Sequence, residues 1–109
     1  MALKKGDIID EKKNYEKSCG IAVKVLSGGG GFQNMMCCGY NLGGKDVVKV
    51  FDPSIKRMEG KVVKKGVVID ESKNNPKSCG LVVEVLGGGA GFKEIVCCGN
   101  VLTEKDVAK

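Results

Sequence analysis

Residues 18–39 read SCGIAVKVLSGGGGFQNMMCCG, and residues 78–99 repeat this stretch as SCGLVVEVLGGGAGFKEIVCCG. The likeness extends outward to residues 4–49 and 64–109, which align without a gap at an offset of 60 and are identical at 27 of 46 positions. All six cysteines lie within the repeated stretches and hold the same positions in both. A duplication that keeps every cysteine in register predicts two equivalent thiol sites.

The chain has 109 residues, a length typical of one domain or of two very small ones. We expect a first repeat at residues 4–49, a linker at 50–63 that contains Asp-Pro-Ser and Met-Glu-Gly, and a second repeat at 64–109. A unit of 46 residues buries little apolar surface, and units of this size usually depend on a metal, disulfides or a partner. Here each repeat can be the partner of the other.

The composition excludes several classes of function. The chain has no histidine and no tryptophan, and we expect it not to be an enzyme, because no carboxylate–His or Cys–His pair can form. Among its 18 basic residues only Arg57 is an arginine, which disfavours nucleic-acid binding, while the net charge of +5 suits acidic protein partners. No stretch resembles a signal peptide or a membrane span, so we expect a cytoplasmic protein without membrane contact and with reduced thiols.

Each repeat is predicted to open with a short β-branched strand at residues 8–9 or 67–69, followed by two longer strands. Residues 21–26 and 81–86 carry β-branched residues at alternate positions, and residues 32–36 and 92–96 lead directly into Cys-Cys-Gly. The glycine-rich residues 27–31 and 87–91 match no phosphate-binding pattern and predict hairpin turns. We therefore predict a small, mostly-β fold of two β-hairpin repeats with pseudo-twofold symmetry.

Such hairpins would gather the cysteines of each repeat at one end. Thiolates are soft ligands for iron, zinc and iron–sulfur clusters, and a glycine directly after a ligand cysteine lets backbone N–H groups turn toward the sulfur. Gly20, Gly39, Gly80 and Gly99 hold that position. We expect two metal sites, one per repeat, with the ligands Cys19, Cys37 and Cys38 in the first and Cys79, Cys97 and Cys98 in the second.

The motif Cys-Gly followed by a Val-rich stretch, a glycine-rich loop ending in Phe, and Cys-Cys-Gly resembles desulforedoxin and the N-terminal domain of desulfoferrodoxin. The resemblance covers about 25 residues of each repeat. It implies a rubredoxin-like fold, one iron held by four cysteines in each unit, and electron transfer in an anaerobe. It also implies that the tandem copy corresponds to the family's homodimer fused into one chain.

The chain departs from the family at the first cysteine cluster, where the family carries Cys-x-x-Cys-Gly. The position three residues before Cys19 is Glu16, and the position three before Cys79 is Pro76, so the first ligand of each cluster is missing. A carboxylate shared by the repeats could fill the place, from Asp10 or Glu11 and from Asp70 or Glu71, although a solvated strand end is the simpler interpretation of these residues. A [4Fe–4S] cluster on three cysteines, completed by water or a partner chain, and loss of the site are further alternatives.

The leading hypothesis for function is an iron-binding redox protein with one iron or iron–sulfur centre per repeat, which exchanges single electrons with a redox partner protein. The alternative is a small accessory subunit of a larger oxygen-sensitive enzyme, in which iron–sulfur or zinc sites serve stability or docking. The nature of the metal, its nuclearity, the redox potential and the oligomeric state are left open by the sequence.

Overall fold

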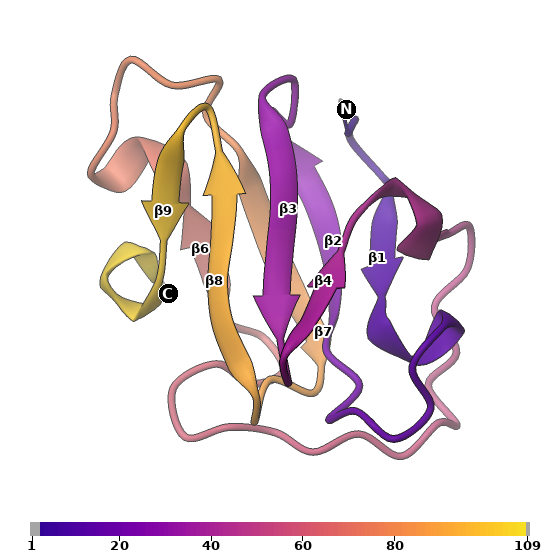
Figure 1. Ribbon diagram of the computed structural model, residues 1–109. Helices are drawn as coiled ribbons and strands as arrows, with labels where there is room; N and C mark the ends of the chain where they lie inside the picture. Colours follow the sequence, from indigo (N-terminus) through magenta and orange to yellow (C-terminus); the bar gives the residue numbers. More distant parts are fainter. Residues whose placement is uncertain (1–2, 109) are drawn as a thin grey trace.

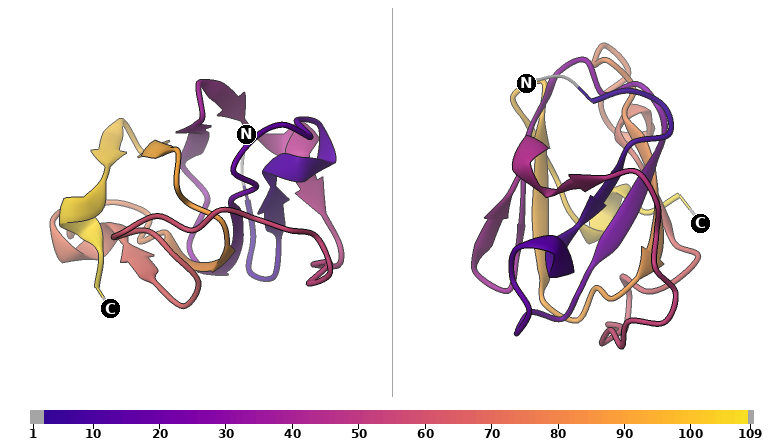
Figure 2. Two further views of the ribbon diagram at one scale, coloured as in Figure 1. Left: turned by 90° about the horizontal axis from the view of Figure 1, so that it is seen from below. Right: turned by 90° about the vertical axis from the view of Figure 1, so that its right-hand side faces the viewer.

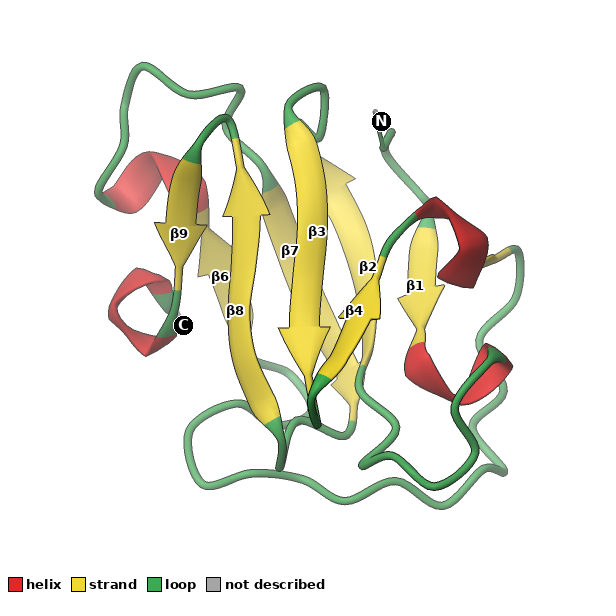
Figure 3. Ribbon diagram, in the orientation of Figure 1, coloured by secondary structure: helices red, strands yellow, loops and turns green. Residues whose placement is uncertain are grey.

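The computed structural model describes residues 3–108, which form two antiparallel sheets and four single turns of 3-10 helix (Figure 3). The first sheet has the strand order β5-β1-β2-β7-β6 and the second has the order β4-β3-β8-β9. The mostly-β, two-repeat fold expected from the sequence is confirmed. Within residues 3–108 no helix is long and apolar enough to cross a membrane.

The first repeat contributes five strands to the two sheets. They are β1 (Ile8–Asp10), β2 (Ala22–Ser27), β3 (Phe32–Cys37), β4 (Tyr40–Leu42) and β5 (Val47–Val48). The second repeat contributes β6 (Val68–Asp70), β7 (Val82–Gly87), β8 (Phe92–Cys97) and β9 (Asn100–Leu102). The helical turns are η1 (Glu11–Lys13), η2 (Gly44–Asp46), η3 (Glu71–Lys73) and η4 (Glu104–Asp106).

The central pair of each sheet joins the two repeats. β2 pairs with β7, and β3 pairs with β8, both antiparallel, so each strand lies beside its own copy (Figure 1). This arrangement gives the molecule an approximate twofold axis, which passes between β2 and β7 in one sheet and between β3 and β8 in the other. Neither repeat forms a sheet of its own, and the boundaries 4–49, 50–63 and 64–109 remain a prediction about sequence units.

The predicted hairpins within the repeats are wrong. β2 and β3 belong to different sheets, as do β7 and β8, and the glycine-rich residues between them carry the chain from one layer to the other (Figure 2). The reason is the amphipathic pattern of these strands, which have one apolar face each. A lone two-stranded hairpin would leave that face in water, whereas two stacked sheets cover it from both sides.

The core lies between the two layers. The core contains Val23 and Val25 of β2 and Met35 of β3, all at most 1 % exposed, and the second repeat supplies the counterparts Val83, Val85 and Ile95. Because β3 and β8 run in opposite directions, with Cys37 opposite Phe92 and Phe32 opposite Cys97, the cysteines of the two repeats end at opposite ends of the sandwich. The fold therefore separates two sites rather than merging them.

Candidate metal centres

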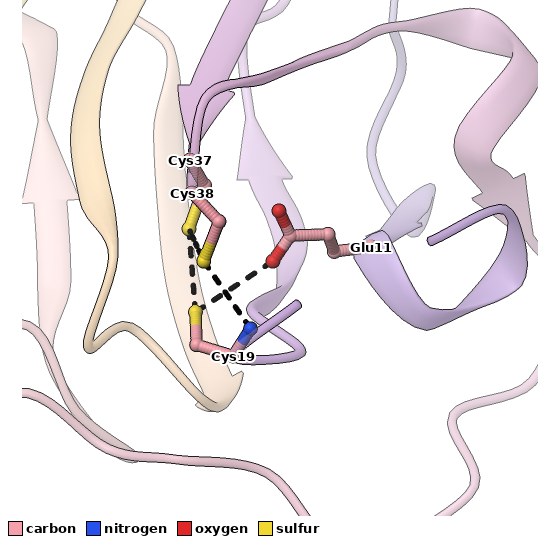
Figure 4. A group of neighbouring side chains, drawn as sticks. All are labelled: Glu11, Cys19, Cys37 and Cys38. Atoms are coloured by element: carbon pink, nitrogen blue, oxygen red, sulfur yellow. Dashed lines mark hydrogen bonds between the residues drawn. The ribbon is translucent and has the colours of Figure 1, made fainter. Parts of the chain in front are cut away.

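The first centre gathers one carboxylate and three thiols (Figure 4). Cys37 ends β3, Cys38 follows it in a turn, Cys19 precedes β2, and Glu11 begins η1. Ligand atoms of these four residues all lie within 4.8 Å of one another. The Sγ of Cys19 is 3.3 Å from the Sγ of Cys37, which in turn is 3.9 Å from the Sγ of Cys38. The expected meeting of these cysteines is confirmed, although through two sheets instead of a hairpin.

The second centre has the same plan. The Sγ of Cys79 lies 3.4 Å from the Sγ of Cys97, and the Sγ atoms of Cys97 and Cys98 are 4.0 Å apart. Glu71 brings its Oε1 to 3.5 Å from the Sγ of Cys79. These four ligands are also within 4.8 Å of one another. All six cysteines singled out in the sequence are thus divided between two compact clusters.

Glu11 is the residue whose place the sequence left open, and the simpler interpretation as a solvated strand end is wrong. Glu11 is 0 % exposed, and its Oε1 accepts hydrogen bonds from the backbone N–H of Gly20 (3.2 Å) and Ile21 (3.3 Å). Its Oε1 is 3.6 Å from the Sγ of Cys19. The turn η1 rotates the chain at the end of β1, so the carboxylate points inward. Glu71 is buried in the same way at the start of η3.

Asp10 and Asp70, the other carboxylates considered, do not join the clusters. Each caps the helical turn that follows it, because the Oδ1 of Asp10 accepts from the N–H of Lys12 and that of Asp70 accepts from the N–H of Ser72. Asp10 also forms a bidentate ion pair with Arg57. Among the described residues, the carboxylates that complete the clusters are therefore Glu11 and Glu71.

The paired cysteines lie in tight turns. Cys38 and Gly39 have φ angles of 55° and 77° between the antiparallel strands β3 and β4, as expected for a two-residue turn of type I′. Cys98 and Gly99 repeat these angles at 54° and 76°. A side chain at positive φ is uncommon and strained, so the turn holds the second thiol in a conformation that the backbone itself disfavours. The sequence signal for this turn was the Gly after the cysteine pair.

The glycine-rich loops do more than turn the chain. The loop of each repeat contacts the centre of the other: the N–H of Cys38 donates to the carbonyl of Gly91, and that of Cys98 donates to the carbonyl of Gly31, both at 2.8 Å. A Cβ on Gly91 would lie 2.3 Å from the Sγ of Cys38, and one on Gly31 would lie 2.2 Å from the Sγ of Cys98. The loops thus need glycine because they pass directly over the thiols.

This contact between the glycine loop of one repeat and the centre of the other, which we call the crossing of the glycine loops, also changes the acidity of the thiols. The pKa of Cys19 is lowered to about 4, first by the hydrogen bond from Cys37 and, against the effect of burial, by the backbone of Gly91 and Gly89. The pKa of Cys37 is raised, because its thiol donates to Cys19 and is buried. Burial and the charge of Cys19 raise the pKa of Glu11. Backbone groups of the second repeat therefore stabilise a thiolate of the first.

The four side chains fit a single metal ion. Tetrahedral coordination with metal–sulfur bonds of about 2.3 Å places sulfur atoms roughly 3.8 Å apart, close to the observed spacings of 3.3 and 3.9 Å. The Oε2 of Glu11 is buried and has no hydrogen-bond partner among the described residues, which is costly unless a cation is bound nearby. In the second centre the side-chain amide of Asn100 donates to the Oε2 of Glu71 at 3.2 Å.

The covers of the two centres differ. Tyr15 and Tyr40 stack beside the first centre with ring centroids 4.1 Å apart, and the second repeat has Asn75 and Asn100 at these positions. Next to the second centre lies an open pocket of about 420 Å³, lined in part by Asn75, Cys98 and Asn100.

The linker covers part of the first centre. The N–H of Met58 donates to the carbonyl of Cys19 at 2.8 Å, and the guanidinium of Arg57 donates to the carbonyl of Gly20 at 3.0 Å. Cys19 is consequently 1 % exposed, whereas Cys79 is exposed. Sequence reasoning missed this cover, and its one signal was the single arginine of the chain.

The two clusters thus provide a carboxylate and three thiols each, of similar geometry and unequal exposure. Comparison of this chain with protein-family models, with curated proteins and with solved structures gives no match, so its function is inferred from the geometry of these two centres.

Proposed function

We propose that each centre binds one iron ion and that the protein carries single electrons between partner proteins. The observation that carries this proposal is the convergence of one carboxylate oxygen and three sulfur atoms within 4.8 Å in each repeat. Soft thiolates favour iron and zinc, and iron bound there supplies a one-electron Fe(III)/Fe(II) couple. A desulforedoxin-like role, with Glu11 and Glu71 in place of the missing cysteine of each repeat, is part of the proposal.

The compactness of the centres favours one ion over an iron–sulfur cube. A cube binds each cysteine to a different iron, which requires the sulfur atoms to stand well apart. In the first centre the thiols of Cys19 and Cys37 are 3.3 Å apart, and the hydrogen bonds to Glu11 already hold its carboxylate against them. Insertion of a cube would have to open this arrangement.

The chain's own groups set the properties of the centre. Backbone N–H groups donate to thiolates, spread their charge and raise a reduction potential, and one such bond runs from the N–H of Cys19 to the Sγ of Cys38 at 3.2 Å. The hard oxygen of Glu11 favours the oxidised ion and acts in the opposite direction. With four protein ligands present, no position is kept open for a substrate, which suits electron transfer better than catalysis.

A second candidate is a structural zinc site, as in an accessory subunit. The observation in its favour is the burial of three of the four residues of the first centre, since Glu11, Cys19 and Cys37 are all at most 1 % exposed while Cys38 is exposed. A closed four-ligand site is typical of structural zinc, and its binding free energy would add to that of folding.

Metal analysis of anaerobically purified protein separates these functions. For the electron carrier we expect about two irons per chain, no acid-labile sulfide, visible thiolate-to-iron charge-transfer bands that bleach on reduction, and a high-spin ferric EPR signal. Colourless protein with zinc would establish the structural site instead, and stoichiometric sulfide would establish a cluster.

A single substitution tests the number of centres. Cys38→Ser should remove about half of the iron and leave the spectrum of the centre at Cys79, Cys97 and Cys98 intact, because the centres lie at opposite ends of the sandwich. Cys98→Ser is the matched variant for the other end. Loss of all metal from either folded variant would contradict separate centres.

A further inference from the structure

The linker contains a segment that binds to the first repeat much as a separate peptide would. This latch segment, residues 51–59, has no strand or helix of its own and contacts the loop that carries Cys19. In Figure 1 it runs along the lower end of the sandwich, where β3 ends. Its contacts with the first repeat show which chemistry that surface recognises.

Arg57 is the centre of the latch segment. Its side chain is 4 % exposed, its guanidinium donates to both carboxylate oxygens of Asp10 at 2.7 and 3.0 Å, and it donates to the carbonyl of Gly20. The ring of Phe51 covers the guanidinium at 4.7 Å. Bidentate pairing of this kind is specific to arginine and is not reproduced by lysine.

The main chain of the latch segment adds further bonds. Met58 donates its N–H to the carbonyl of Cys19 and accepts from the N–H of Ala90, and Glu59 forms a β-bridge with Gly89. The latch segment therefore contacts the carboxylate of Asp10 and two loop carbonyls of the first repeat, and it also bonds to the glycine loop of the second repeat.

The second repeat offers the same groups without such a segment. Asp70, Cys79 and Gly80 stand where Asp10, Cys19 and Gly20 stand, at the offset of 60. All three members of the first set are buried, whereas Cys79 is exposed and the other two are half-buried. Within residues 3–108, no hydrogen bond reaches the carbonyl of Cys79 or of Gly80. The chain has no second arginine to supply one.

We propose that this exposed surface at Asp70, Cys79 and Gly80 is a docking site for an extended segment of a partner protein that carries an arginine followed by an apolar residue. The guanidinium of the partner's arginine donates hydrogen bonds to the carboxylate of Asp70 and the carbonyl of Gly80. The backbone N–H of the residue after that arginine donates to the carbonyl of Cys79. The carboxylate of Asp70 and the carbonyls of Cys79 and Gly80 are all acceptors, which complement a guanidinium and an unpaired backbone N–H.

One position beside these surfaces differs between the two repeats and gives a further test of the proposal. Gly87 leaves room for Arg57, since a Cβ there would lie 2.9 Å from the Cδ of the arginine. The equivalent position beside the second surface is Ser27, which is exposed and pairs with Val82 in the sheet. The hydroxymethyl group of Ser27 narrows the path of an incoming arginine, so Ser27→Gly should strengthen docking.

Docking would place the partner against Cys79, a ligand of the second centre, and this consequence alone rests on the proposed function. The docking itself needs no metal. A failure of peptide binding is therefore distinguishable from a failure of iron binding, which metal analysis measures separately.

The test uses the full chain and a labelled peptide that copies residues 51–59, with binding followed by fluorescence anisotropy. We expect saturable binding to the wild type, weakened about tenfold or more when the arginine of the peptide is replaced by glutamine or when the protein carries Asp70→Asn. Asn still caps η3, so this variant keeps the fold. Ser27→Gly should tighten binding severalfold, and Glu94→Gln, which removes the same charge from the other sheet, should change nothing.

Three results would overturn the proposal. They are no binding of the peptide, equal binding of the glutamine peptide, and a dependence on Asp10 instead of Asp70, which would mean that the peptide only displaces the chain's own latch segment.

Discussion

The first and second centres have the same four ligands and unlike surroundings. At the first, Arg57 and Met58 cover the loop of Cys19, and the stacked rings of Tyr15 and Tyr40 lie beside the cluster. At the second, Cys79 is exposed and Asn100 binds the carboxylate of Glu71. Ligand geometry is thus set by the repeated core, whereas access to the ligands is set by residues that the repeats do not share.

The loss of a whole centre is the largest effect we expect, and it tests the crossing of the glycine loops. Gly91→Ala should abolish metal binding at the first centre, although Gly91 belongs to the second repeat, because its Cβ would collide with the Sγ of Cys38. Metal analysis should then give about one ion per chain. Gly31→Ala should remove the second centre in the same way.

Gly30→Ala is the matched control, since a Cβ there meets nothing within 4 Å and the second repeat has Ala90 at this position. It should keep both metals. If Gly91→Ala instead empties the second centre, the assignment of loops to centres is wrong.

Removal of the positive charge of Arg57 should leave the first centre uncovered, as the second centre is. Arg57→Gln leaves Asp10 buried without its cation, and loss of one partner of a buried ion pair costs about 3–5 kcal/mol. Urea unfolding of the variant should show this loss in the free energy of unfolding, while Lys56→Gln, an exposed neighbour, should stay within about 0.5 kcal/mol of the wild type. A loss below about 1 kcal/mol would show that Arg57 contributes little to the cover.

Exposure should also separate the rates at which the centres release metal. We expect a chelator to remove metal from the second centre about tenfold faster, roughly 1.4 kcal/mol in barrier, because Cys79 is exposed whereas its counterpart Cys19 is buried. The variants Cys19→Ser and Cys79→Ser, each with one centre left, assign the two phases. Tyr40→Asn should accelerate release from the first centre, and equal rates in the two variants would contradict the role of the covers.

The smallest effect concerns a feature that both repeats share. Asp46 and Asp106 are buried and each accepts hydrogen bonds from an asparagine, Asn14 or Asn74, and from a backbone N–H. Burial alone would raise the pKa of Asp46, but the bonds from Asn14, Gly43 and Lys45 outweigh it and lower the pKa. A lowered pKa in the folded state means stability that is present above the unfolded pKa of about 3.8 and lost as the pH falls through the folded value.

Asp46→Asn and Asp106→Asn should therefore each cost about 1 kcal/mol at pH 7, by similar amounts. The difference from the wild type should shrink below about pH 4, where the wild-type carboxylates become protonated. Urea midpoints measured between pH 3 and pH 7 check this, and a pH-independent difference would contradict the charged hydrogen bonds.

The sequence predicted the ligands better than the path of the chain between them. The meeting of Cys19 with Cys37 and Cys38 was predicted from a hairpin, and it holds without one because β2 and β3 run in opposite directions in the two stacked sheets, which brings the end of β3 back to the start of β2 (Figure 1). Local pattern could not tell that β2 pairs with β7 instead of β3, since an alternating strand pairs equally well with its neighbour or with its copy. That choice depends on covering two apolar faces at once.

For a related reason the sequence left the place of Glu11 open between the cluster and a solvated strand end, and gave no place to Arg57. A glutamate after a short strand looks like a solvated strand end, and only the helical turn η1 together with the N–H groups of Gly20 and Ile21 makes its burial tolerable. The partner of Arg57 is 47 positions away along the chain, beyond the reach of any local rule.

The crossing of the glycine loops has a consequence for biosynthesis. The carbonyl of Gly91 and the backbone of Gly89 complete the surroundings of Cys38 and Cys19. During translation the first three cysteines leave the ribosome long before residue 91 does, and at about 5–20 residues per second this interval lasts several seconds. In the second centre the order is reversed, because the loop at Gly31 is synthesised before the cysteines that it contacts. The first cluster therefore becomes complete only after Gly91 has been synthesised and the second only after Cys98, so the proposed metals would bind after these points in translation.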